Sequence, residues 1–120
     1  MTKGPILVVD DDKFIRETLV AVLEDEGYGV QVAEHGAEAL ALMEAAPPRV
    51  VLLDLRMPVM DGWTFAREVR ARGYTAPIIV LTAAQALPRE TEHVEADAIM
   101  EKPFDIEELI NQIEQLCAAP

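Results

Sequence analysis

Aspartate residues follow directly after two of the most apolar runs in the chain. Asp10 and Asp11 come after Ile6–Val9, and Asp54 comes after Val50–Leu53. Carboxylates held within a few ångströms of one another repel, and a divalent cation between them removes that repulsion. A carboxylate-rich site made only of oxygen atoms suits Mg²⁺, which keeps several waters and needs few protein ligands.

Two further polar residues come at or near the ends of apolar runs. Thr82 follows Ile78–Leu81, and Lys102 comes shortly after Ala98–Met100. A carboxylate nucleophile, Mg²⁺, a lysine and a hydroxyl donor are together the parts that phosphoryl transfer requires. Each residue alone is more often a helix cap, a strand end or a surface turn, so only the combination is informative.

The apolar runs are short, rich in β-branched residues and continuous, which is typical of strands buried on both faces of a parallel sheet. Tyr28–Val32 predicts a weaker strand. Helical spacing of apolar residues lies between the strands and predicts helices around these ranges: Ile15–Leu23, Ala39–Met43, Trp63–Val69 and Ile106–Cys117. Residues 85–95, interrupted by Pro88, predict a short or irregular fourth helix.

This alternation predicts an α/β fold, a doubly wound (βα)5 three-layer sandwich around a five-stranded parallel sheet. The carboxyl ends of parallel strands share one edge of the sheet, and ligands bind there at the point where the strand order reverses. The polar residues at the strand ends should therefore converge at that edge: Asp10, Asp11, Asp54, Thr82 and Lys102.

Length and charge narrow the possible functions. The 120 residues suit one folded domain spanning 1–120, and the net charge of −12 disfavours nucleic-acid and anionic membrane partners. The single cysteine, Cys117, permits no internal disulfide. No run is apolar and long enough for a signal peptide or a membrane span, so we expect a cytoplasmic domain without an attached output module.

Four segments together resemble the receiver domain of response regulators. They are Ile6–Asp12, Leu53–Gly62, Val80–Ala83 and Lys102–Phe104, and the resemblance extends over nearly the whole chain. It implies a flavodoxin-like sheet of strand order 2-1-3-4-5. It also implies a role in two-component or phosphorelay signalling, as an acceptor of phosphoryl groups and not as a turnover enzyme.

The resemblance also implies roles for individual residues. Asp54 would be the phosphoacceptor, and the protein ligands of Mg²⁺ would be Asp10, Asp11, Asp54 and the backbone carbonyl of Arg56. Asp12, the third acid, is expected to cap the first helix. His35 and His93 lie in polar segments and are expected to be solvated.

Lys102 would pair with the phosphoryl oxygens, before a cis bond to Pro103, and Thr82 would be the switch hydroxyl. Ile99 occupies the position where the family usually has an aromatic switch residue, which departs from its pattern. The implied donor is a histidine kinase or a histidine phosphotransfer protein. The response would change the surface around helix 4, strand 5 and helix 5, where a downstream protein would bind.

Three other functions remain as alternatives. A Mg²⁺-dependent phosphohydrolase with an aspartyl-phosphate intermediate usually has its nucleophile on the first strand, whereas Asp54 follows the third predicted strand. A receiver-like interaction module acting without phosphorylation would accommodate Ile99. A flavin-binding domain is disfavoured, because three aspartates after the first strand would repel the flavin phosphate.

Overall fold

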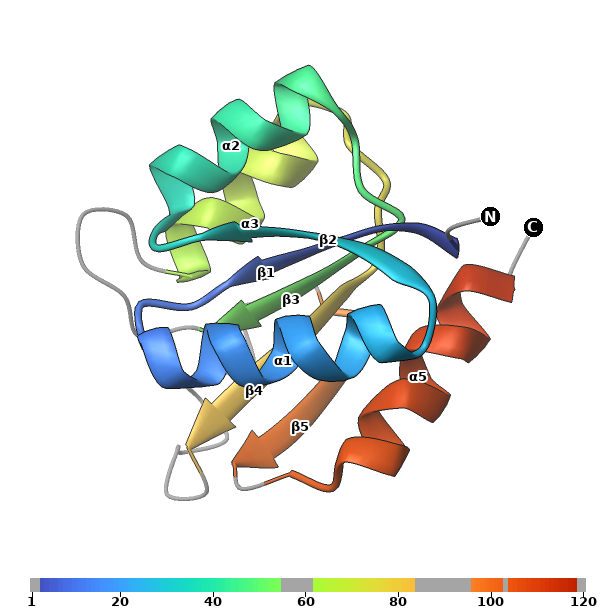
Figure 1. The fold of residues 1–120 in the computed structure, drawn as a ribbon. Helices are drawn as coiled ribbons and strands as arrows, with labels where there is room; N and C mark the ends of the chain where they lie inside the picture. The colour runs from blue at the N-terminus through green and yellow to red at the C-terminus, as the bar shows by residue number, and fades with distance from the viewer. Residues whose placement is uncertain (1–2, 55–61, 84–95, 103, 119–120) are drawn as a thin grey trace.

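One parallel sheet forms the centre of the protein. The computed structural model describes residues 3–54, 62–83, 96–102 and 104–118. The five strands lie in the order β2-β1-β3-β4-β5, which confirms the predicted fold (Figure 1). Their bounds are β1 Lys3–Val9, β2 Tyr28–Ala33, β3 Val50–Asp54, β4 Ile78–Ala83 and β5 Ala98–Lys102.

Helices cover both faces of this sheet. The helices of the described residues are α1 Lys13–Asp25, α2 Gly36–Ala45, α3 Gly62–Ala71 and α5 Ile106–Ala118. Helices α1 and α5 lie against one face, and α2 and α3 lie against the other (Figure 1). The predicted irregular fourth helix falls in residues 84–95, outside the described residues.

Alternate strand residues face the two layers of helices. In β1, Ile6 and Val8 pack with the α1 and α5 side of the core, whereas Leu7 and Val9 pack with the α2 and α3 side. All four side chains are at most 1% exposed. Burial on both faces explains why these strands are continuous apolar runs instead of alternating ones.

Capping side chains and a glycine define the ends of α1 and the start of α2. The carboxylate of Asp12 accepts hydrogen bonds from the backbone N–H groups of Phe14 and Ile15, as predicted for an N-cap. Gly27 has φ of 94°, the left-handed conformation that ends α1. His35, which was expected to be solvated, is half-buried, and its Nδ1 accepts a 3.2 Å hydrogen bond from the N–H of Glu38, so that it caps α2.

Candidate functional site

Strand register brings the aspartates together. Strand β1 pairs with β3 through Val9 and Leu53, so that Asp10 and Asp54 are the next residues along two neighbouring strands. The chain passes from β1 to β2 on one side and then to β3 on the other, which makes this pair of strands the point of reversal. The site therefore lies where the parallel topology predicts a ligand.

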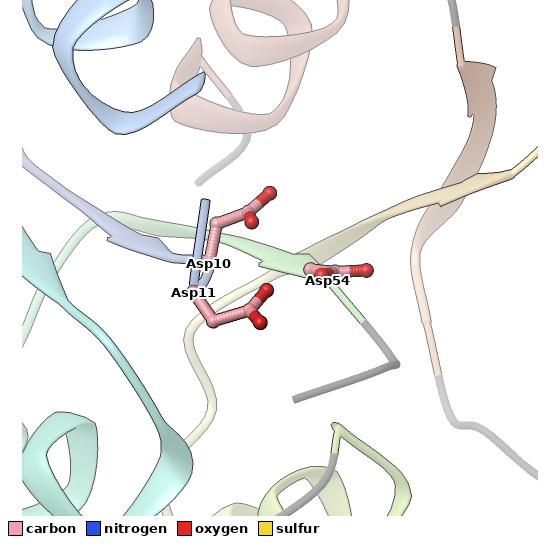
Figure 2. A group of neighbouring side chains, drawn as sticks. All are labelled: Asp10, Asp11 and Asp54. Atoms are coloured by element: carbon pink, nitrogen blue, oxygen red, sulfur yellow. The ribbon is translucent and has the colours of Figure 1, made fainter. Parts of the chain in front are cut away.

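Three carboxylates form a compact group at this edge. One carboxylate oxygen from each of Asp10, Asp11 and Asp54 lies within 4.8 Å of the others. Figure 2 shows the three side chains extending in the same direction from the ends of β1 and β3. Asp10 is 1% exposed, whereas Asp11 is exposed to solvent. The prediction that these three residues converge is confirmed.

This carboxylate group fits a small divalent cation. A Mg–O distance of about 2.1 Å places two oxygens of one octahedral ion at most about 4.2 Å apart. The observed limit of 4.8 Å is close to that spacing, so small side-chain rotations are sufficient. The donors are all hard oxygen atoms, and Asp11 is exposed to solvent, so waters could complete the coordination.

Hydrogen bonds hold Asp10 on three sides. Its backbone N–H donates to the carbonyl of Ala33 at 3.1 Å, which extends the pairing of β1 with β2 by one residue. One of its carboxylate oxygens accepts from the N–H of Asp12 at 2.9 Å, and its carbonyl accepts from Arg16 Nη1 at 2.8 Å. Buried carboxylates require such partners, because an unpaired buried charge is costly.

Sequence reasoning missed Arg16. The residue lies within the first helix, where arginine is ordinary, and its charge did not mark it as different from other surface residues. The signal available in the sequence was its place one turn after the cap, which puts a long cationic side chain above the end of β1.

Thr82 lies on the strand next to Asp54. Asp54 pairs with Leu81 of β4, and Thr82 is the following residue, with 7% of its surface exposed. Thr82 pairs in turn with Glu101 of β5, and Lys102 ends that strand. The backbone positions of Asp54, Thr82 and Lys102 are therefore on three successive strands at one edge, although the Lys102 side chain lies outside the described residues.

The remaining predicted residues are placed in part. Ile99 lies in β5 with its side chain 47% exposed, so an apolar group faces solvent at the predicted switch position. Arg56, Pro103 and His93 lie outside the described residues, and so does the proposed cis bond. No helix among the described residues is both long and apolar enough to cross a membrane.

Fold and site together define a flavodoxin-like α/β domain with an acidic site at its topological switch point. The family model of the response regulator receiver domain matches residues 6–114. The chain belongs to this family, and it is the receiver domain of a two-component response regulator. Domains of this family are generally signalling modules and not enzymes.

Relatives and solved structures agree with this assignment. Response regulator MprA of Mycolicibacterium vanbaalenii is 41% identical over 113 residues, covering 92% of this chain and 49% of that protein. This chain therefore spans about half the length of the curated relatives it matches.

Among solved structures, a Francisella response regulator 1452 receiver domain has a TM-score of 0.87 at 32% identity, covering 95% of this chain and 96% of that chain. The Vibrio cholerae chemotaxis protein CheY4 has a TM-score of 0.85 at 35% identity, covering 94% of this chain and 98% of that one.

Proposed function

We propose that Asp54 accepts a phosphoryl group with the help of a Mg²⁺ ion held by Asp10, Asp11 and Asp54. The observation that supports this most directly is the convergence of three carboxylate oxygens within 4.8 Å at the switch point. Asp54 ends β3 and is half-buried. The backbone carbonyl of Arg56 is the fourth proposed ligand.

The reaction begins with attack of an Asp54 carboxylate oxygen on the phosphorus of a phosphohistidine. The new P–O bond forms as the P–N bond breaks, and the imidazole of the donor leaves with the electron pair. The product is an acyl phosphate, which water later hydrolyses to regenerate the carboxylate. The donor would be a histidine kinase or a histidine phosphotransfer protein, which supplies the phosphohistidine.

Electrostatics decides whether this attack is possible. Three carboxylates and an incoming phosphoryl group repel one another, so positive charge must be supplied at the site. When bound, Mg²⁺ supplies most of that charge and lowers the repulsion between nucleophile and phosphoryl oxygens. Lys102, at the end of β5, is proposed to pair with the phosphoryl oxygens, and Thr82 to donate a hydrogen bond to them.

The phosphoryl group would then act as a switch. It adds about −1.5 to −2 charge at the edge of the sheet. Turning a mostly inactive population into a mostly active one requires about 5.5 kcal/mol of differential interaction. A hydrogen bond from Thr82 to the charged phosphoryl group supplies about 1.5–3 kcal/mol, so contacts of Lys102, the cation and the backbone must supply the rest.

Ile99 is proposed to be an apolar contact residue on the surface where a downstream protein would bind. Its side chain is 47% exposed on the edge strand β5, two strands away from Asp54. Movement of Thr82 on the neighbouring strand would change the surroundings of β5, and this would change the affinity for a downstream protein. The same exposed residue is what favours the second candidate, an interaction module whose partner binds whether or not Asp54 is phosphorylated.

The experiment is intact-mass measurement after incubation with acetyl phosphate or phosphoramidate. With Mg²⁺ the wild type should gain one phosphoryl group, and it should gain none with EDTA. The Asp54→Asn variant should gain none under either condition, whereas Asp25→Asn, which makes the same change at the exposed end of α1, should match the wild type. An equal adduct on Asp54→Asn, or no adduct on the wild type, would reject the proposal.

Two further points are part of the proposal. Residues 1–120 are proposed to form one receiver domain that is located in the cytoplasm. We also propose that it makes no direct contact with nucleic acid or membrane, because its net charge of −12 disfavours both. Its chemistry is limited to its own phosphorylation and dephosphorylation. Steady hydrolysis of small phosphomonoesters would instead indicate a phosphohydrolase.

A further inference from the structure

Arg16 of α1 reaches back to the acidic turn that follows β1. Its Nη1 donates a 2.8 Å hydrogen bond to the backbone carbonyl of Asp10, and its Nη2 lies 3.4 Å from Oε1 of Glu34. The Arg16 side chain is 12% exposed, whereas that of Glu34 is 65% exposed. The guanidinium group therefore joins the end of β1 to the residue after β2, largely shielded from water.

This hydrogen bond acts on the peptide unit between two candidate ligands. The carbonyl of Asp10 and the N–H of Asp11 belong to one planar peptide group, so fixing the oxygen fixes the orientation of the whole unit. Two other hydrogen bonds hold Asp10 itself: the N–H of Asp12 donates to its carboxylate, and its own N–H donates to the carbonyl of Ala33. Arg16 holds the unit itself, from which the exposed Asp11 side chain extends.

We infer that Arg16 is a positioning residue for the divalent-cation site, acting through the Asp10–Asp11 peptide. The inference rests on the proposed function, because it assumes that Asp10, Asp11 and Asp54 bind Mg²⁺. Arg16 donates and carries positive charge, so it is not itself a ligand. Partners that orient metal ligands typically change metal affinity by about 10- to 100-fold when they are removed.

The charge and the hydrogen bond of Arg16 have opposite effects on cation binding. A positive charge beside the site repels Mg²⁺, so losing it would tighten binding. Losing the hydrogen bond releases the Asp10–Asp11 peptide and would weaken binding. Glu34 lies 3.4 Å from the same guanidinium and offsets its charge, so we expect the loss of orientation to dominate. The direction of the change therefore separates the two roles.

The test is calorimetric titration of MgCl2 into the wild type, Arg16→Met and Arg70→Met at fixed ionic strength. Arg16→Met should bind Mg²⁺ about tenfold more weakly or worse. Arg70 is the matched control, because it bonds the carbonyls of Tyr74 and Ala76 and lies 3.5 Å from Asp97, before β4 begins. The same charge is lost there at the opposite edge of the sheet, and affinity should stay within about twofold because screening weakens distant charges.

Each outcome has a distinct meaning. Unchanged or tighter Mg²⁺ binding by Arg16→Met overturns the inference, and so does an equal loss in Arg70→Met, which would indicate general destabilisation. Arg16→Lys keeps the charge and one donor, so it should recover part of the affinity, and it replaces Arg16→Met if that variant does not fold. A wild type that binds no Mg²⁺ overturns the proposed function as well, whereas binding that Arg16 substitution does not weaken overturns the inference alone.

Discussion

At the scale of single residues, the surroundings of Asp10 show what sequence can and cannot predict. Asp10 and Asp54 each end an apolar strand, and a parallel sheet brings such residues to one edge, so their meeting was predictable. The hydrogen bond from Arg16 to the Asp10 carbonyl was not, because it depends on how α1 lies against the end of β1. Tertiary packing sets that angle, and no local pattern encodes it.

Tyr28 offers a pH-dependent prediction at this scale. Burial raises the pKa of its hydroxyl above the ordinary value of 10.0, with further increases from the negative charges of Cys117, Glu114 and Glu26. As pH rises above 10.0, the unfolded chain ionises before the folded one. The free energy of unfolding should therefore be unaffected by Tyr28 below that pH and fall as pH rises toward the raised pKa.

Urea unfolding of the wild type and Tyr28→Phe from pH 8 to 11 measures this effect. The wild type should lose stability more steeply than the variant above the ordinary tyrosine pKa of 10.0. The region near pH 8 serves as the internal control, because neither state of Tyr28 ionises there. Parallel curves for the two proteins across the whole range would contradict the role given to Tyr28.

At the scale of elements, helix ends were predictable where the capping residue is a common one. Asp12 was an expected cap, and its carboxylate accepts a hydrogen bond from the first turn of α1, as the carboxylate of Asp105 does from the first turn of α5. The cap formed by His35 was not predicted, because histidine rarely caps and its surroundings looked like an ordinary polar loop. Helix α1 matters for function since it begins directly after the acidic pair and carries Arg16.

Asp12→Ala should therefore destabilise the protein. The substitution removes the acceptor for the N–H groups of Phe14 and Ile15, which should lower the free energy of unfolding by about 1 kcal/mol. Asp25→Ala is the control, because it makes the same change at the exposed C-terminal end of α1, where a negative charge opposes the helix dipole. It should be neutral or slightly stabilising in the same denaturant experiment, and equal losses would contradict the capping role.

At the scale of the whole molecule, the order of the sheet and both layers of helices followed from the chain's apolar patterns and its family resemblance. Short continuous runs such as Val50–Leu53 predict strands buried on two faces, and the structure places them there. Residues 85–95 lack such a pattern, because Pro88 interrupts a mostly polar segment, and there the sequence predicts only a short or irregular helix. The net charge of −12 attracts cations to the whole domain, in addition to any cation bound at the three aspartates.

Mg²⁺ should accordingly stabilise the folded protein. At a concentration one hundred times Kd, binding to the native state alone raises the free energy of unfolding by about 2.7 kcal/mol. Thermal unfolding in MgCl2, compared with NaCl at equal ionic strength, separates specific binding from general relief of charge repulsion. Asp11→Asn should lose most of the specific increase, whereas Asp25→Asn should keep it. Equal melting temperatures in the two salts would argue against a Mg²⁺ site.

Chemical localisation of the acceptor tests the account most directly. Reduction of an aspartyl phosphate with borohydride converts that aspartate to homoserine, and peptide sequencing by mass spectrometry then identifies the position. After treatment of the protein with phosphoramidate and Mg²⁺, we predict homoserine at residue 54, at the end of β3, and at no other aspartate. Homoserine at residue 10 or 11 instead, or at none of the three, would contradict the assignment of Asp54 as phosphoacceptor.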